Sequence, residues 1–578
     1  MKRCPTCQRT YTDEVKFCRV DGVTLVNDSA GLSESEATRV LPESRATGEA
    51  PTEVFRDTGE GKLTTSALSP GPPSAAIGPA RKSMSGRKLA LIAALVVLLV
   101  VVPIVIVVAG YVSYRHARNT EVAIDSIAVL PFENQNRDAS VEWLSDGVTE
   151  SIINNLAQLP NLRVSPRSSV FRYKGKETDP LEAGKALGVR AVLTGRLQQR
   201  DDEVIISAEL VDLRDNKQLW GEQYQRKMAD LLTVQRDIAR EITNNLRPRL
   251  SGSEQNRVTK QYTANSEAYQ LYLKGRFYWN KRTINDFKRA STYFQQAIDK
   301  DPNYALAYSG LADSYGLLAV FGAGPPKDWM PQAKTAAMKA LALDDSLAEA
   351  HASLGLITAY YDWDFVGAER ELRRAIELNP NYATAHEWRA ENISSLKRHD
   401  EALAEIRRAL ELDPLSLIIN RVYADLLLNA RRYDEAIEQY RKTIEIDPNF
   451  RTAHERLVRA YEAKGMYDQA IAEYLASPAS SERLTGMKET YTKSGWNGVL
   501  QILLASLLEK SKKDYVRPFS VASLYARLGQ KDEAFAWLEK AYQDRDYQMT
   551  ELNVRTDMDL LRGDPRFADL LRRVGLPQ

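Results

Sequence analysis

The chain has 578 residues, of which 44% are hydrophobic and 27% charged, a composition that is ordinary for folded protein. Lys and Arg number 78 against 77 Asp and Glu, a net charge of +1 that excludes a globally basic nucleic-acid binder and an acidic disordered chain. All three cysteines lie between Cys4 and Cys18, which excludes a disulfide framework for the remainder of the chain.

The N-terminal residues 1–27 have the spacing of a metal-binding knuckle. The pattern is C-x2-C-x10-C-x2-D, formed by Cys4, Cys7, Cys18 and Asp21. Two ligand pairs separated by about a dozen residues suit a four-coordinate structural Zn²⁺. The segment resembles the short zinc ribbons at the N-termini of many bacterial membrane proteins, although those end in C-x2-C-G where this chain has Asp21. We expect bound zinc; the alternative is a metal-free knuckle with three buried thiols.

Residues 28–112 are predicted to form a tether followed by a membrane span. Residues 28–86 are rich in Ser, Pro, Gly, Ala and Glu, a composition typical of a disordered linker. Residues 89–112 carry no charge and as a helix would be about 36 Å long, enough to cross a bilayer core of about 30 Å. The basic residues before this segment outnumber those after it, which favours a cytoplasmic N-terminus and periplasmic C-terminal domains. These residues are Arg81, Lys82, Arg87 and Lys88 before the segment, and Arg115 and Arg118 after it.

Residues 120–250 show the pattern of an α/β domain. Strands are predicted at 126–132, 162–167 and 190–199 and within 203–227, because these segments are short and apolar or alternate in polarity. Helices are predicted at 144–159, with Asp146 as a plausible N-cap, at 179–188, ending at Gly188, and at 229–250.

Several phrases in this region resemble one family. SIAVLPFEN, LSDGVTESIINNL, LRVSPRSSVFRYKGK and VDLRDNKQLWGEQYQR occur in order and resemble the TolB-like N-terminal domain. The resemblance implies a non-enzymatic, envelope-facing or sensory module with no agreed ligand. Such domains are found attached to adenylate cyclases, winged-helix regulators and kinases, often followed by tetratricopeptide repeats. The usual cytoplasmic effector is missing here, and the knuckle stands in its place. With the charge bias, the resemblance implies a single-pass protein of the bacterial inner membrane.

Residues 262–578 are predicted to form an all-α solenoid of tetratricopeptide repeats with a C-terminal cap. Pro380, Pro414 and Pro448 recur at a constant spacing that equals the tetratricopeptide period. Small and large residues recur at fixed offsets before these prolines and allow neighbouring helices to approach closely. They are Ala368, Leu372, Ala375, Ala402, Ile406, Ala409, Ala436, Tyr440 and Thr443, and again Ala534, Leu538 and Ala541. Six or seven helix pairs are expected, with a degenerate one near 482–513 and a Gly- and Pro-containing loop at 321–330.

The inner helices of such a solenoid are expected to form a groove that binds an extended or helical peptide. Six charged residues are offset from the core positions and would line it: Glu387, Glu391, Arg421, Asp425, Glu455 and Arg459. The alternative for each residue is a solvated charged face without a ligand. His386 and His454 occupy equivalent repeat positions and are interpreted as packing or surface residues, not as metal ligands.

These features predict a membrane-anchored adaptor that binds a partner protein and is not an enzyme. No P-loop, kinase signature or G-x-S-x-G motif occurs, no small-molecule substrate is evident, and no nucleic-acid partner is expected. Two alternatives stay open. One is a transmembrane regulator whose knuckle contacts DNA or polymerase, for which the knuckle offers five basic residues. The other is an accessory part of a cyclase-type signalling system. The five basic residues are Lys2, Arg3, Arg9, Lys16 and Arg19.

Overall fold

A computed structural model describes residues 2–3, 10–11 and 26–27, residues 124–246 apart from 160 and 177, and residues 260–478 and 486–578. The chain divides into two compact units, residues 1–106 and 107–578. In the first unit, three two-residue strands form an antiparallel sheet in the order β2-β1-β3. They are β1 (Lys2–Arg3), β2 (Thr10–Tyr11) and β3 (Val26–Asn27). The four predicted zinc ligands and the tether 28–86 lie outside the described residues.

The predicted localisation needs correction. None of the helices within 124–246, 260–478 and 486–578 combines the length and the apolar character that crossing a bilayer requires. This finding contradicts a single-pass inner-membrane protein with periplasmic C-terminal domains. The prediction was made from the uncharged run 89–112, which lies outside the described residues.

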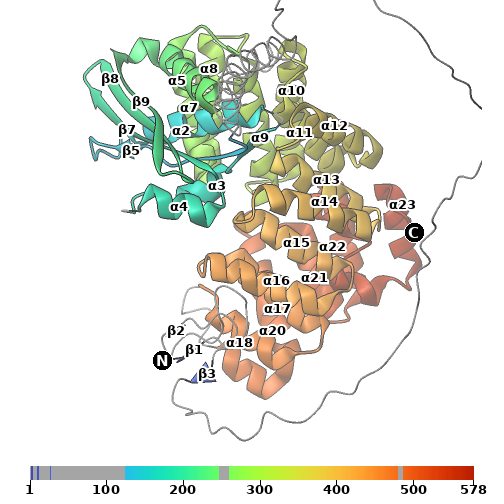
Figure 1. Cartoon of the computed structure of the whole chain (residues 1–578). Helices are drawn as coiled ribbons and strands as arrows, with labels where there is room; N and C mark the ends of the chain where they lie inside the picture. Colours follow the sequence, from blue (N-terminus) through green and yellow to red (C-terminus); the bar gives the residue numbers. More distant parts are fainter. Residues whose placement is uncertain are drawn as a thin grey trace, which may run out of the picture. The chain divides into compact units, whose positions relative to one another are not determined.

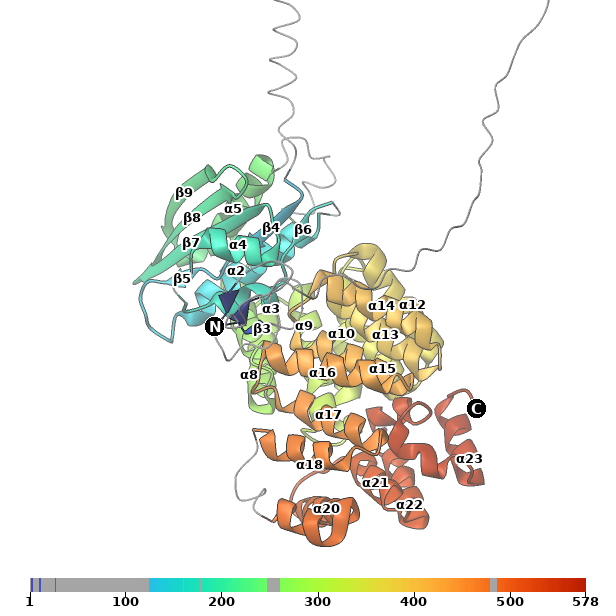
Figure 2. The ribbon, with the colours of Figure 1, turned by 60° about the horizontal axis from the view of Figure 1, so that its bottom comes forward.

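The α/β domain is built on one mixed sheet in the order β6-β4-β7-β8-β9, with β5 paired to β7. Strand β4 is parallel to β6 and β7, whereas β7, β8 and β9 are antiparallel neighbours that Figure 2 shows side by side. The strands are β4 (Ser126–Val129), β5 (Glu133–Asn134), β6 (Arg163–Val164), β7 (Ala191–Arg200), β8 (Glu203–Asp212) and β9 (Lys217–Lys227). The helices are α2 (Glu142–Ala157), α3 (Arg167–Val170), η1 (Phe171–Tyr173), α4 (Pro180–Leu187), η2 (Met228–Asp230) and α5 (Leu231–Leu246).

The sequence pattern predicted the approximate positions of these elements correctly, but it misplaced the N-cap of helix α2. Gly188 ends α4 with a left-handed φ of 63°, as expected of a glycine that closes a helix. Asp146 does not cap α2, because the helix begins one turn earlier, at Glu142, with Val141 before it. Asp146 instead lies buried inside α2, where it forms ion pairs with Lys174 and Arg167.

Seven helix pairs follow within the described parts of 260–578. Figure 1 shows the helices from α7 to α18, which form the first six pairs, stacked in chain order. They are α7 (Ser266–Trp279) with α8 (Ile284–Lys300), α9 (Ala305–Phe321) with α10 (Pro326–Leu343), α11 (Ala348–Ile357) with α12 (Phe365–Leu378), α13 (Ala383–Ser395) with α14 (His399–Leu412), α15 (Leu417–Asn429) with α16 (Tyr433–Ile446), α17 (Arg451–Ala463) with α18 (Tyr467–Ala476), and α21 (Pro518–Arg527) with α22 (Lys531–Gln543). Helix α20 (Met487–Ser511), kinked at Gly495, takes the place of the degenerate pair. The loop predicted at 321–330 is shorter, because Pro326 begins α10.

The repeat period is visible in the backbone. Trp363, Lys397, Arg431 and Gly465 recur at the spacing of the repeat prolines, and each has a φ between 62° and 72° in the loop that joins an inner helix to its outer partner. The turn therefore imposes the left-handed conformation whether or not a glycine is present. All twelve residues predicted to pack between helices are buried, from Ala368 to Ala541. The predicted packing of the helix pairs is confirmed.

The C-terminal segment folds back onto the middle of the solenoid. It comprises α21, α22, η4 (Tyr547–Glu551), η5 (Thr556–Leu561) and α23 (Pro565–Val574). Trp363 and Phe365, around the start of α12, share a hydrophobic cluster with this segment. The η3 turn (Thr358–Asp362) contacts η4, where the rings of Tyr360 and Tyr547 stack with centroids 5.2 Å apart. This return encloses the inner face of the repeats.

Candidate functional site

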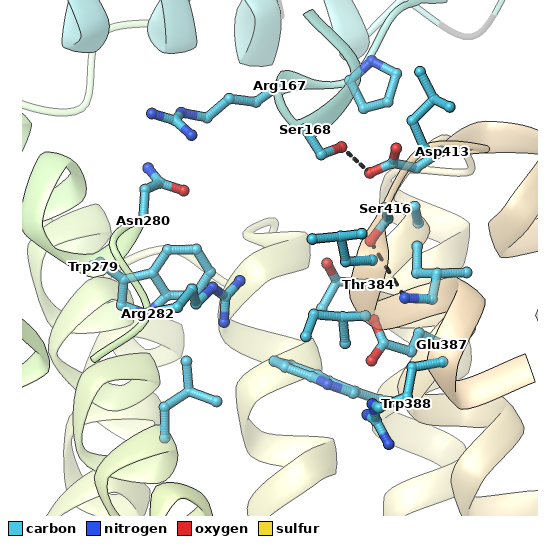
Figure 3. Close-up of a pocket in the computed structure, with 18 of the residues that line it drawn as sticks. Arg167, Ser168, Trp279, Asn280, Arg282, Thr384, Glu387, Trp388, Asp413 and Ser416 are labelled. Atoms are coloured by element: carbon cyan, nitrogen blue, oxygen red, sulfur yellow. Dashed lines mark hydrogen bonds between the residues drawn. The ribbon is translucent and has the colours of Figure 1, made fainter. Parts of the chain in front are cut away.

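A large cavity lies where the inner helices of the repeats face the α/β domain and the returning C-terminal segment. Its volume is about 1240 Å³, and its walls come from α2 and α3, from the inner helices α7 to α17, and from η4. Figure 3 shows Ser168 hydrogen-bonded to Asp413 at one edge of this pocket, with Trp279, Asn280 and Arg282 on one side of it and Thr384, Glu387 and Trp388 on the other. The cavity therefore combines residues from distant parts of the chain.

The junction of α3 with the α14–α15 loop forms one edge of the cavity. Ser168 donates a hydrogen bond to one carboxylate oxygen of Asp413, and Ser169 donates to the other at 3.2 Å. Burial raises the pKa of Asp413, although these hydroxyls and the backbone amides of Leu415 and Ser416 stabilise its charged form. Asp413 lies at the end of α14, so this contact joins the α/β domain to the repeats.

A buried ion-pair network joins α2 to α7 on the opposite side. Arg276 donates to Glu150 at 2.8 Å, Asn280 donates to it at 2.6 Å, and Arg167 lies 3.1 Å away. Burial alone would raise the pKa of Glu150, but the charges of Arg276 and Arg167 outweigh it and lower the pKa. Glu150 is thus fully partnered and serves to fix this wall.

Five of the six predicted groove residues line the cavity: Glu387, Glu391, Arg421, Glu455 and Arg459. The sixth, Asp425, is not part of the lining. Its carboxylate accepts hydrogen bonds from Tyr440 and Arg421 and lies 3.8 Å from Arg456. Glu455 is half exposed and pairs with Arg451 at 2.8 Å. Asp425 and Glu455 are therefore already neutralised by neighbours.

Some charged side chains of the lining have no such partner among the described residues. In the described structure Glu387, Arg282 and Arg459 form no ion pair and no hydrogen bond, although Glu387 is only 6% exposed. Burial raises the pKa of Glu387 to about 7, and burial lowers the pKa of Arg282 to about 10 and of Arg459 to about 9. Arg282 lies over the ring of Trp279 at 3.8 Å. Burial removes solvation from these groups, and the opposite charges near them act without forming an ion pair: Arg421 and Arg282 on Glu387, Glu387 on Arg282, and Asp557 on Arg459.

Sequence reasoning missed three walls of the cavity. Ser168 and Tyr547 lie outside the helix pairs, and Arg282 lies in the α7–α8 loop, ahead of the repeats whose prolines recur at constant spacing, so no spacing rule relates them to the groove. Arg456 also lines the cavity and could have been predicted from the repeat spacing, because it occupies the repeat position that Trp388 has on α13. The sequence prediction named its neighbour Glu455 as the groove residue instead.

The metal prediction is not tested by the folded domains. The four expected Zn²⁺ ligands, Cys4, Cys7, Cys18 and Asp21, lie outside the described residues. Within the part of the chain that is described, no group of three or more His, Cys, Asp or Glu is arranged to hold a metal ion. His386 and His454 each contact a glutamate and a backbone carbonyl, which agrees with a packing role.

Family comparisons identify the helix pairs. Residues 358–416, 423–482 and 519–543 match tetratricopeptide repeat models, so the chain carries these repeats. Repeats of this kind are typical of protein-interaction scaffolds. Residues 123–241 match the second domain of HilA/YgeH-like transcriptional regulators. The TolB-like resemblance of this domain is therefore not supported, and the similarity to the HilA-like domain replaces it.

Curated relatives resemble parts of the chain. A putative adenylate cyclase 3 of Rhizobium meliloti is 33% identical over 240 residues, 41% of this chain and 40% of that protein. The transcriptional regulator HilA of Salmonella typhimurium is 26% identical over 285 residues, 48% of this chain and 49% of that protein. The chain thus spans half or less of the length of these relatives. A thermophilic TPR protein of Thermus thermophilus is similar to 32% of this chain over 96% of its own length, at 23% identity and a TM-score of 0.29.

Proposed function

We propose that this chain is a protein-interaction scaffold whose cavity binds a peptide segment of a partner protein. The observation that supports the proposal is the 1240 Å³ cavity on the inner face of the repeats, with charged side chains that lack partners within the described structure. The chain would act by binding and not by catalysis.

The size of the cavity favours a peptide over a small molecule. Sites for small ligands typically occupy about 300–1,000 Å³ and are mostly apolar. This cavity is larger and lined by many charged groups, and it runs across α13, α15 and α17, which contact one another in sequence. An extended peptide that crosses several inner helices matches this shape.

The unpartnered charges support a ligand of complementary charge. A buried charge without a counter-ion destabilises the folded state, and such groups are typical of binding sites, where a ligand supplies the missing partner. Glu387 and Arg459 lie on different inner helices, α13 and α17, so one ligand would have to extend across the repeats to reach both.

Site-specific photocrosslinking in the full chain tests this proposal. A benzophenone amino acid would replace Thr384, which lines the cavity, or Lys442, which is 56% exposed on the outer helix α16. We expect a discrete protein adduct at position 384 in producing cells, lost when Arg459→Glu is added, and no such adduct at position 442. Equal adducts at both positions, or an adduct at 384 that is insensitive to Arg459→Glu, would contradict the proposal.

A second candidate is a regulatory protein in which the α/β domain and repeats receive a signal. It is favoured by the match of residues 123–241 to a domain of transcriptional regulators and by the similarity to a protein named as an adenylate cyclase. Formaldehyde crosslinking of the full chain, followed by sequencing of co-purified DNA, separates the two candidates. Reproducible enrichment of particular DNA sites would favour the regulator, and protein adducts alone would favour the scaffold.

A further inference from the structure

An acidic pair on α13 faces the cavity and forms no ion pair with a cation among the described residues. Glu387 and Glu391 lie one helical turn apart and both line the cavity. Glu387 is more than nine-tenths buried and has no partner in the described structure. The only hydrogen bond recorded there for the carboxylate of Glu391 comes from the hydroxyl of Tyr360, at 2.9 Å. Figure 3 shows Glu387 directed from α13 into the pocket beside Trp388.

The surroundings of this pair leave it short of positive charge. Burial raises the pKa of Glu387 to about 7 and that of Glu391 to about 8. Arg421, the cation whose charge acts most strongly on Glu387, is held by Asp425. The other charged groups that face the pair are Arg282 and Asp413 for Glu387, and Glu551 for Glu391. These raised pKa values keep the carboxyls partly protonated in the empty cavity, and an entering cation would stabilise their charged forms.

Aromatic rings next to the pair suit the stem and the face of a long cationic side chain. Tyr360 stacks on Tyr547 with centroids 5.2 Å apart, and both rings line the cavity together with Trp388. Guanidinium and ammonium groups are attracted to such ring faces. The site therefore offers both charge and π-contact to an arginine or lysine.

Arg459 on α17 offers the opposite charge. It faces Arg456, Arg527 and Arg555, and the nearby carboxylate of Asp557 is already bound by Arg555 at 2.5 Å. Arg527 is likewise paired, with Glu462 at 2.5 Å. Arg459 alone among these four arginines makes no ion pair in the described structure, so an incoming anion would be its first partner.

The two subsites are separated by one intervening inner helix, α15. Neighbouring packed helices lie about 8–10 Å apart, so α13 and α17 are about 16–20 Å apart. An extended chain advances about 3.3 Å per residue and covers this distance in about five or six residues.

We propose that the cavity selects an extended peptide that carries an arginine or lysine for Glu387 and Glu391 and, about five or six residues away, an aspartate or glutamate for Arg459. This inference rests on the proposed function and names the class of peptide that the same cavity takes.

Selection of random dodecapeptides displayed on phage by the immobilised full chain tests the inference. Wild-type protein should enrich peptides with a basic and an acidic residue at that spacing. Glu387→Gln with Glu391→Gln should remove the preference for the basic residue and weaken binding of a wild-type-selected peptide by about tenfold or more. Arg459→Gln should remove the preference for the acidic residue only.

Matched substitutions on outer helices serve as controls. Glu438→Gln on α16 and Arg408→Gln on α14 change exposed charges of the same kind and should leave the selected sequences unchanged. Selected peptides that crosslink in the cavity but lack the charge pair, or that keep it in the α13 and α17 variants, would overturn this inference and leave the proposed function standing. Failure of the wild-type chain to enrich any peptide would overturn both, whether or not the variants fold.

Discussion

Ser168 donates a hydrogen bond to Asp413, far along the sequence, and this contact joins the α/β domain to the loop between α14 and α15. Its neighbour Ser169 donates to the second oxygen of the same carboxylate. The cavity owes one of its edges to this pair of serines, so the rigidity of the binding surface depends on both domains.

Removal of both serine hydroxyls should destabilise this junction. Ser168→Ala with Ser169→Ala leaves the buried carboxylate of Asp413 without its side-chain donors, at a cost of about 1–3 kcal/mol. Urea denaturation of the full chain, followed by circular dichroism, should show a lower midpoint. Ser291→Ala, which removes an exposed hydroxyl on α8, is the control and should leave the midpoint unchanged.

Replacement of Glu387 should stabilise the protein in a pH-dependent way. The pKa of this carboxyl is raised from 4.5 to about 7 in the folded chain. The wild type therefore loses stability as the pH rises from about 4.5 to about 7, because the unfolded chain releases this proton from about pH 4.5 whereas the folded chain keeps it until about pH 7. Glu387→Gln removes this titration and should gain about 1–3 kcal/mol over wild type at pH 8.

The measurement is the difference in melting temperature between Glu387→Gln and wild type at pH 5 and at pH 8. We expect a small difference at pH 5 and a clear increase for the variant at pH 8. A variant that is less stable than wild type at pH 8 would show that Glu387 already has a stabilising partner within the protein. Glu438→Gln, on the solvent side, should show no dependence of this kind.

Two neighbouring repeats have different side-chain pairs at equivalent positions. A double substitution can test whether one pair replaces the other. His454 donates to the carbonyl of Pro448 at 2.9 Å and contacts Glu473. One repeat earlier, Asn420 donates to the carbonyl of Pro414 at 2.9 Å and accepts from Gln439. Both pairs have the same sequence separation and join the turn, the inner helix and the outer helix of a repeat.

We therefore expect His454→Asn with Glu473→Gln to stay within about 1 kcal/mol of wild type, because it reproduces the neighbouring pair. His454→Ala should cost about 1–3 kcal/mol, because it leaves the turn carbonyl and Glu473 without a donor. The unfolding midpoints of the wild type, the single variant and the double variant distinguish these two expectations. A double variant as unstable as His454→Ala would refute the equivalence of the two pairs.

Two glycines on α9 should respond in opposite directions to alanine. A Cβ at Gly310 would lie 2.6 Å from the ring of Phe294, which is fully buried and cannot move away. Gly310→Ala should therefore cost about 1–3 kcal/mol. The nearest atom to a Cβ at Gly316 is 3.6 Å away, so Gly316→Ala should be neutral or stabilising by up to about 1 kcal/mol. Melting temperatures of the two variants provide the comparison.

The zinc site stays a prediction from the sequence, and metal analysis of the full chain tests it. We expect about one zinc per chain, lost on Cys7→Ser and weakened on Asp21→Ala, because a structural site needs all four ligands. Protein that is purified without chelator and dialysed against metal-free buffer should be compared by elemental analysis. Equal zinc content in wild type and Cys7→Ser would refute the site.

The sequence alone determined the repeats, because their signals are local. A constant period, small residues at fixed offsets and prolines after each pair specify helices that bury one stripe, and this information lies within each repeat. The same period placed Glu387, Glu391 and Arg459 on the inner face. It could not distinguish them from Asp425, which has the same register but is bound by Tyr440 and Arg421.

Only the tertiary structure decided which charges lack a partner among the described residues and what encloses them. Ser168 and Tyr547 reach the cavity from segments outside the helix pairs, and Arg282 reaches it from the α7–α8 loop. Their place around one cavity depends on the fold-back of the C-terminal segment and on the docking of the α/β domain. Burial, and with it the pKa of a carboxyl such as Glu387, is a property of that enclosure. A sequence pattern places a side chain on a helix face, but the elements that remove water from it come from elsewhere in the chain.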